Sequence, residues 1–170
     1  MNKLQQLLNQ LETDSIAYLE KRKVIFSIGD LGDKHAVPHL MQMLPNETNV
    51  SVRDALAMAL GDLHAHEAVP MIVELIRQPG NENRRGSLIY ALQGLDCAEH
   101  FLYFIELICT ANFECRQMSL FLIEKYADSI DRSTKDKALE LLSFYEDQLT
   151  KVDTVAEREN KLDFIAGNYL

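Results

Sequence analysis

The stretch GDLHAHEAVP, residues 61–70, nearly repeats GDLGDKHAVP, residues 29–38. Both the Gly-Asp-Leu and the Ala-Val-Pro tripeptides recur after the same interval, from 29 to 61 and from 36 to 68. A period shared by two separate motifs is hard to obtain by chance, and periods of this length are typical of solenoids made of helix pairs. The sequence therefore predicts an all-α fold built from a repeating helix pair.

One apolar stripe recurs on the first helix of each predicted pair. Its members follow the spacing i, i+4, i+7, which places them on one face of a helix. The spacing is found three times at the same interval, so each first helix is expected to turn this stripe toward the core. The stripe consists of Val24, Ile28 and Leu31, then Leu56, Leu60 and Leu63, then Leu88, Leu92 and Leu95.

The second helix of each pair carries its own repeated core positions. Pro38 and Pro70 lie close to the predicted start of the first two of these helices. A missing N–H has no cost there, because the first-turn donors have no intrahelical acceptor. In the third copy Leu102 replaces the proline, and Asp96 is expected to cap the helix instead. The core positions are Val37, Leu40 and Leu44, then Val69, Ile72 and Ile76, then Phe101, Phe104 and Ile108.

The domain organisation predicted from this pattern is a single domain spanning residues 1–170. Residues 1–12 are expected to form an N-terminal capping helix, with Leu4, Leu7, Leu8 and Leu11 on one face. Residues 14–149 are expected to hold about four repeats, the first helix being capped by the stretch Thr13-Asp14-Ser15.

The C-terminal part of the chain departs from the repeat. A fourth pair is expected at about 113–126 and 133–149, and it lacks the repeated Gly-Asp sequence. Residues 151–170 are expected to form either a capping helix, since solenoid ends need a cap, or a tail that orders on binding. The expected core positions are Leu139, Leu142 and Leu149 in the fourth pair, and Val155, Leu162, Phe164 and Ile165 in the C-terminal segment.

Composition narrows the functional classes. Hydrophobic residues make up 47% of the 170 residues and charged residues 25%, which is typical of a globular domain. No apolar run approaches the roughly 20 residues of a membrane span, and the N-terminal stretch mixes polar residues among its leucines. We therefore expect no signal peptide, no membrane association and a cytoplasmic location.

Net charge indicates the kind of partner, and the cysteine content indicates the state of the thiols. The net charge is −9, with 17 basic against 26 acidic residues, whereas nucleic-acid binders need Lys and Arg to displace phosphate counterions. A protein partner with a basic surface fits better than nucleic acid. Cys97, Cys109 and Cys115 contain no CxxC pair, so we expect buried free thiols and neither a disulfide framework nor a cysteine zinc site.

A family resemblance is carried by the residues Arg53, Ala55, Ala59-Leu60-Gly61, Ala68-Val69-Pro70 and Leu75-Ile76. This pattern resembles HEAT repeats, in particular the short bacterial subtype first recognised in phycobilin lyases. The resemblance covers residues 21–108 well and extends loosely to about 149. It implies a right-handed α-α superhelix of about four helix pairs with N- and C-terminal capping helices, in which the second helices line a concave surface.

Nine positions on the second helices fall between the core positions and form three predicted rows across that surface. Aromatic and Met side chains supply contact area for binding, and carboxylates supply charge complementarity. We interpret these positions as a partner-binding groove with an apolar strip flanked by acid, the alternative being an ordinary solvated helix face. The rows are His39, Met71 and Tyr103; Gln42, Glu74 and Glu106; and His35, Glu67 and Glu99.

Two pairs of histidines are candidate metal ligands. His35 and His39 are four residues apart, a spacing at which both can reach one metal, but no third His or Cys ligand follows at a standard spacing. His64 and His66 flank a turn. Because no HExxH, GxSxG, Walker or GxGxxG motif occurs, we predict no catalytic, cofactor-binding or metal-binding residue and no enzymatic activity.

Repeated charged residues are interpreted as structural. Asp30 and Asp62 follow the repeated glycine, where a carboxylate can cap the next helix or pair with an arginine. Arg53, Arg85 and Arg116 open successive first helices and are expected to make contacts between repeats, since Arg readily joins buried carboxylate pairs.

Three functions from different classes follow from these observations and the resemblance. The first is a non-catalytic protein-binding module, an adaptor or regulator that uses the acidic concave face, with an immunity-type inhibitor of a basic toxin as one form. The second is a phycobilin-lyase-like subunit, for which four repeats are short. The third is a HEAT-like DNA glycosylase, which needs a basic and aromatic concave surface where this chain carries glutamates.

Overall fold

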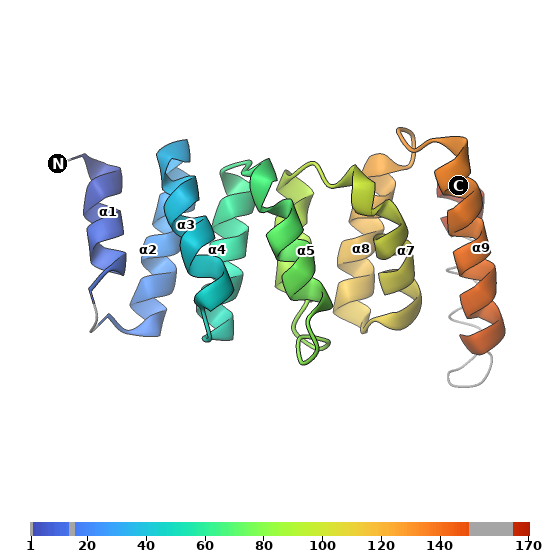
Figure 1. Cartoon of the computed structure of the whole chain (residues 1–170), viewed down its shortest axis with the longest axis horizontal. Helices are drawn as coiled ribbons and strands as arrows, with labels where there is room; N and C mark the ends of the chain where they lie inside the picture. Colours follow the sequence, from blue (N-terminus) through green and yellow to red (C-terminus); the bar gives the residue numbers. More distant parts are fainter. Residues whose placement is uncertain (1, 14–15, 150–164) are drawn as a thin grey trace. The chain divides into compact units, whose positions relative to one another are not determined.

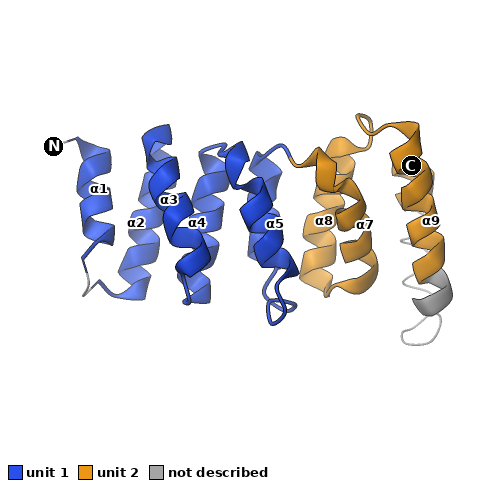
Figure 2. Ribbon diagram, viewed as in Figure 1, with its two compact units in different colours: residues 1–96 blue, residues 97–170 orange. Residues whose placement is uncertain are grey.

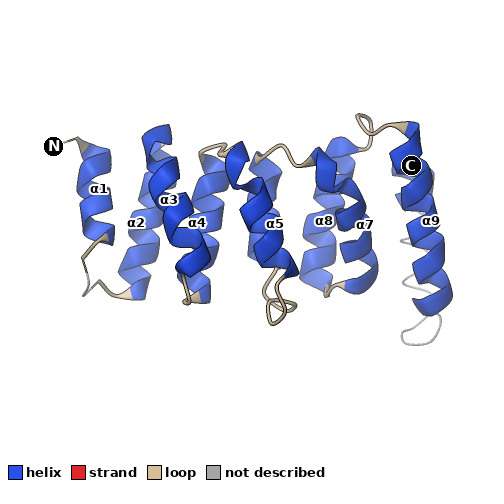
Figure 3. Cartoon of the chain, in the orientation of Figure 1, coloured by secondary structure: helices blue, strands red, loops and turns tan. Residues whose placement is uncertain are grey.

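The computed structural model describes residues 2–13, 16–149 and 165–170. Its regular secondary structure in these ranges is helical, and they contain no strand (Figure 3). The predicted all-α fold of helix pairs is therefore confirmed. The chain divides into two compact units, residues 1–96 and residues 97–170, each of which is described by itself (Figure 2).

Unit 1 consists of a single helix followed by first and second helices in alternation. The first helices α2, α4 and α6 pack against one another in that order, and α3 and α5 pack on α4 and α6 (Figure 1). Short 3-10 turns lead into α3 and α5. The helices are α1 (Lys3–Leu11), α2 (Tyr18–Leu31), α3 (Val37–Met43), α4 (Val50–Asp62), α5 (Val69–Arg77) and α6 (Gly86–Ala91).

The N-terminal helix forms as the sequence predicts. The Asn2 side chain caps α1 by accepting a hydrogen bond from the Gln5 backbone N–H at 2.8 Å. Its four leucines are all buried, so the amphipathic face is confirmed. The N-cap residue of α2 is Ala17, which has no capping side chain, so none of the three predicted capping residues occupies the N-cap position. Asp14 and Ser15 lie outside the described residues.

The apolar stripe of the first helices is buried with one exception. Leu60 and its equivalents are fully enclosed, but Leu31 is 40% exposed, which corrects the prediction for that position. The helices end differently, because α2 stays helical through Leu31 and is capped by Gly32, whereas α4 ends at Asp62 with Leu63 as its C-cap. The two leucines therefore leave the helix at different points.

The second helices bury all nine of their predicted core positions, from Val37 to Ile108. Pro38 and Pro70 lie in the first turn of α3 and α5, as predicted. In the third copy the turn Ala98–His100 begins after Cys97, so Asp96 precedes the N-cap residue. The capping role of Asp96 stays a prediction.

The repeated glycines are required by close helix packing. Gly61 lies within α4, and a Cβ atom placed on it would be 2.5 Å from the Ala91 carbonyl oxygen. A Cβ atom on Gly29 would likewise be 3.2 Å from Cα of Ala59. These glycines therefore recur because neighbouring helices approach closely at them. The left-handed backbone belongs instead to Gly32, with φ of 68°, and to the aligned His64, with φ of 52°.

Unit 2 contains α7 (Phe101–Thr110), α8 (Phe113–Tyr126) and α9 (Arg132–Leu149), with α8 and α9 both packed on α7. Leu142 is buried as predicted. Leu139 is 40% exposed, which contradicts its assignment to the core. The buried face of α9 is formed by Ala138 and Leu142, four residues apart, and Leu139 projects about 100° away from Ala138. The side chain of Leu149 is outside the described part.

The end of the chain contacts α8 within unit 2. Residues 165–169 are helical and Ile165 is buried. The Tyr169 hydroxyl donates a hydrogen bond to Glu124 Oε1. Val155, Leu162 and Phe164 lie outside the described residues, so the cap or tail assigned to residues 151–170 stays a prediction.

The cysteines behave as predicted from their spacing. Cys97, Cys109 and Cys115 are buried free thiols. Burial, followed by the charge of Glu106, raises the pKa of Cys109 to about 12. Such a thiol stays protonated at neutral pH and is a poor nucleophile.

Candidate functional site

The predicted partner-binding positions of unit 1 lie on two helical segments, each preceded by a 3-10 turn. His39 and Gln42 are exposed on α3, and His35 is exposed in the turn before it. Along the second segment, Glu67 and Glu74 are exposed and Met71 between them is half-buried. Within α3 and α5 the later two positions of each segment are three residues apart and lie on the same side of the helix, while His35 and Glu67 lie in the preceding 3-10 turns.

The same spacing is found in unit 2. Glu99 and Glu106 are exposed at either end of the row, and Tyr103 between them is half-buried. Burial raises the pKa of Tyr145 on α9, with further contributions from the charges of Glu106 and Cys109. The Glu106 carboxylate therefore acts electrostatically on the neighbouring second helix. All nine predicted positions are at least partly accessible, and whether they bind a partner stays a prediction.

His35 is engaged by its neighbour Asp33. Asp33 Oδ1 accepts the His35 backbone N–H at 3.0 Å and lies 2.8 Å from His35 Nδ1. These hydrogen bonds and the charge of His35 hold the pKa of the Asp33 carboxyl below its usual value. Across the described ranges, no group of three or more His, Cys, Asp or Glu side chains is placed to hold a metal ion.

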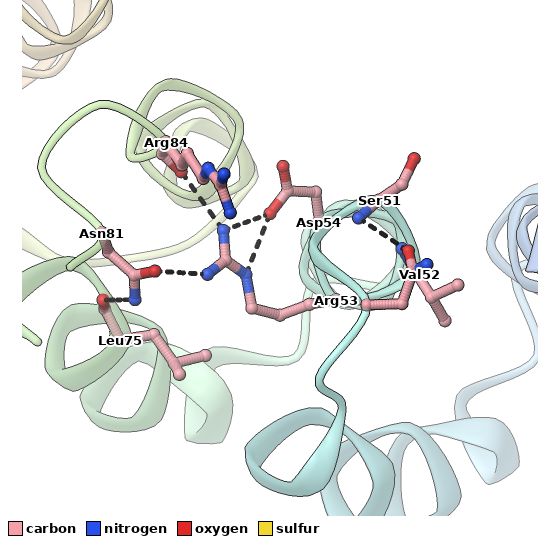
Figure 4. A network of polar contacts seen from close by, with 8 residues as sticks. Ser51, Val52, Arg53, Asp54, Leu75, Asn81 and Arg84 are labelled. Carbon is pink, nitrogen blue, oxygen red and sulfur yellow. Dashed lines mark hydrogen bonds and ion pairs between the residues drawn. The ribbon is translucent and has the colours of Figure 1, made fainter.

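Arg53 makes a buried polar network between α4 and the loop that follows α5 (Figure 4). Its Nε and Nη2 atoms donate to Asp54 Oδ1 at 3.0 and 2.7 Å, and Nη1 donates to Asn81 Oδ1 at 2.7 Å. Nη2 also donates to the Arg84 carbonyl oxygen at 3.2 Å, and Asn81 Nδ2 donates to the Leu75 carbonyl oxygen at 2.8 Å. One guanidinium therefore joins a helix to the loop leading into the next first helix.

This network confirms the structural reading of Arg53 and corrects its partner. The sequence suggests that Asp30 and Asp62 each cap the next helix or pair with one of the repeated arginines. In the first repeat Asp33 caps the turn, and in the second the N-cap residue Ala65 has no capping side chain. The Nε atoms of Arg85 and Arg116 are buried without a hydrogen-bond partner among the described residues, so these two arginines do not repeat the Nε contact of Arg53.

A family model for HEAT repeats matches residues 4–93, slightly more than half of the chain. The chain belongs to the HEAT-repeat family. Comparison with curated proteins finds no match, and neither does comparison with solved structures. No helix among the described residues has both the length and the apolar character needed to cross a bilayer.

The turn between α4 and α5 makes contacts that the sequence did not reveal. His64 Nδ1 lies 2.9 Å from the Gly94 carbonyl oxygen, and the Asp96 backbone N–H donates to His66 Nδ1 at 2.8 Å. Both histidines of this HEAT repeat therefore contact the segment that follows α6. The alignment of His64 with Gly32 indicates the left-handed backbone at this position, but it does not indicate the contact with Gly94.

Proposed function

We propose that this HEAT-repeat protein is a non-catalytic protein-binding module whose partner has a basic surface. The binding surface is the exposed face of the second helices and the turns before them. The observation that carries the proposal is a recurring arrangement in which two exposed glutamates flank a half-buried Met or Tyr. Each unit presents its own part of these positions: unit 1 contributes His35, His39, Gln42, Glu67, Met71 and Glu74, and unit 2 contributes Glu99, Tyr103 and Glu106.

The physical basis is complementarity of charge and shape. Glu67 and Glu74 are seven residues apart, about 10 Å along a helix, and Met71 lies between them. Such a strip suits a partner segment that carries one cationic side chain on each side of an apolar side chain. Exposed carboxylates steer a basic partner and favour it over acidic ones, while Met and Tyr supply contact area.

The finer assignments belong to the same proposal. A net charge of −9 supports an immunity-type inhibitor of a basic toxin as one form of the module, acting in the cytoplasm. A phycobilin-lyase-like subunit is the second candidate, supported by the resemblance of Ala59-Leu60-Gly61 and Ala68-Val69-Pro70 to that subtype. Titration of the purified protein with a bilin separates the two, since a spectral change supports the lyase-like role.

The test of the main proposal is a charge-reversal variant. We expect Glu74→Lys combined with Glu106→Lys to keep the helical circular dichroism spectrum and to weaken the affinity for a captured partner by about tenfold or more, which corresponds to about 1.4 kcal/mol. The affinity of the wild type should also fall as salt is raised, because exposed charges are screened.

A matched control separates local from net charge. Glu12→Lys combined with Asp128→Lys changes the net charge by the same amount at exposed sites away from the second helices. This control should retain wild-type affinity. Full-strength binding by the Glu74/Glu106 variant, or equal weakening by the control, would refute the proposed surface.

A further inference from the structure

Two consecutive peptide groups at the boundary of the units are held by side chains distant in sequence. Asp96 is the last residue of unit 1, and its backbone N–H donates to His66 Nδ1 at 2.8 Å. Cys97 is the first residue of unit 2, and its backbone N–H donates to the Tyr126 hydroxyl at 3.0 Å. The two peptide groups on either side of Asp96 are thus each held by one titratable side chain, by His66 in unit 1 and by Tyr126 in unit 2.

The two anchors differ in their response to protons. A backbone N–H can only donate, so His66 Nδ1 must be the acceptor and must carry no proton. The imidazolium ion has an N–H at both ring nitrogens and no acceptor. Histidine is the side chain whose ordinary titration falls between pH 5 and 8, whereas a tyrosine hydroxyl keeps its proton throughout that range. Of the two anchors, only the His66 contact therefore loses its acceptor when the side chain takes up a proton.

The neighbouring His64 has the opposite polarity and serves as an internal contrast. A carbonyl oxygen can only accept, so the 2.9 Å contact between His64 Nδ1 and the Gly94 oxygen requires a proton on Nδ1. Both the suitable neutral tautomer and the imidazolium ion supply that proton. Protonation of His64 therefore preserves its contact, while protonation of His66 removes the acceptor.

The surroundings of His66 permit protonation. The ring is exposed, so solvent protons reach it directly. The titratable groups on its own turn are Asp62, His64 and Glu67. The segment that it contacts carries Asp96 and continues, into unit 2, to Glu99 and His100. Among these groups, only His64 and His100 can carry a positive charge, and only when they are protonated.

We propose that the His66–Asp96 contact is a pH-sensitive anchor of the junction between the two units. Neutral His66 holds the Asp96 amide, and uptake of one proton by Nδ1 releases it while Tyr126 continues to hold Cys97. Release removes one of the contacts that hold the end of unit 1. This device is independent of the acidic binding surface and goes beyond the proposed function.

The test is backbone amide exchange measured by NMR on the full chain between pH 8 and pH 5. Protection is expressed relative to the intrinsic exchange rate at each pH, and the His66 ring nitrogens are followed in the same samples. We expect the protection of the Asp96 amide to fall about fivefold, which corresponds to the loss of a single net hydrogen bond. The midpoint of this fall should coincide with the midpoint of the His66 ring titration. Protection of the Cys97 amide should stay unchanged.

Two substitutions assign the effect to one ring. His66→Asn places an amide oxygen close to the position of Nδ1, so it can accept from Asp96 but does not titrate, and protection should become independent of pH. His64→Asn removes the other ring of the same turn and tolerates left-handed backbone, so the pH step should persist.

Three results would overturn the proposal. One is protection of the Asp96 amide that stays within twofold while the His66 ring is seen to titrate. Another is a pH step that survives in His66→Asn, and the third is a His66 ring that does not titrate between pH 5 and 8. The wild-type titration decides the matter even if a variant fails to fold.

Discussion

At the scale of single residues, unit 1 depends on glycine where two helices approach most closely. Gly61 faces the backbone of Ala91, and Gly94 faces the backbone of Gly61, where an added Cβ atom would be 2.6 Å from the carbonyl oxygen. Backbone atoms cannot rotate away as a flexible side chain can. The approach therefore tolerates no side chain at either glycine.

We predict that Gly61→Ala destabilises the protein by about 1–3 kcal/mol, the usual cost of overpacking a core. The added methyl group would have to displace the Ala91 carbonyl group, and the greater helix propensity of Ala is too small to offset this. Urea denaturation followed by circular dichroism measures the change. Gly167→Ala is the control, because a Cβ atom there meets open space, and its stability should stay within about 0.5 kcal/mol of wild type. Equal stability of both variants would contradict the close approach.

The residue scale also shows where sequence reasoning stops. The recurrence of Gly29 and Gly61 is visible in the sequence, but the atoms that exclude a Cβ are supplied by helices about 30 residues away. Likewise, the left-handed backbone of His64 follows from its alignment with Gly32, whereas its contact with Gly94 depends on the path of a later segment. Local patterns do not encode such distant neighbours.

At the scale of elements, the helices of unit 1 are held in place by their apolar faces, and the buried polar network of Arg53 adds to this packing. Arg53 is only 5% exposed, and its guanidinium joins α4 to Asn81 and to the backbone of Arg84. A buried cation is stable only when its hydrogen bonds are satisfied, and Asp54 supplies the opposite charge. This network fixes the long loop between α5 and α6.

We predict that Arg53→Met destabilises unit 1 by about 3 kcal/mol, because it leaves Asp54 and Asn81 without their partner. Thermal unfolding measured by calorimetry reports the change. Arg84→Met is the matched control, since the contact to Arg84 uses its backbone oxygen, which the substitution retains. A loss below about 0.5 kcal/mol for Arg53→Met would show that the network adds no stability.

Apolar periodicity predicted the elements well and the polar contacts poorly. The second-helix core of the first three pairs is confirmed at every position, because a 3.6-residue period fixes which side of a helix is apolar. Leu31 and Leu139 were assigned wrongly, since burial at the end or edge of a stripe depends on the neighbouring element. The partner of Arg53 was also wrong, because Asn81 lies in a loop whose conformation has no period.

At the scale of the whole molecule, the chain has two compact units, and the family match lies within the first of them. In repeat proteins each element contacts only its neighbours, so stability is distributed along the chain. The exposed glutamates of the candidate surface could be placed on the second helices from the sequence. The partner that they bind could not be identified from the sequence, because its identity depends on the complementary surface of another molecule.

We predict that Leu60→Ala destabilises unit 1 by about 2–5 kcal/mol through a core cavity, since Leu60 is fully buried. Hydrogen exchange measured by mass spectrometry should show faster exchange across residues 16–96 than across residues 97–145. Leu139→Ala, an exposed leucine, should change exchange little anywhere. Uniform acceleration along the chain after Leu60→Ala would mean that the two units unfold as one.

The paired small residues of the first helices have a consequence for lengthening the chain. Gly29 meets Ala59 and Gly61 meets Ala91, so the same glycine–alanine junction occurs twice in succession. A tandem duplication of one 32-residue module would present matching surfaces at both of its ends. The protein could therefore be extended by inserting whole modules without designing a new interface, whereas an insertion that is not a whole number of modules would break the register of the glycine–alanine contacts.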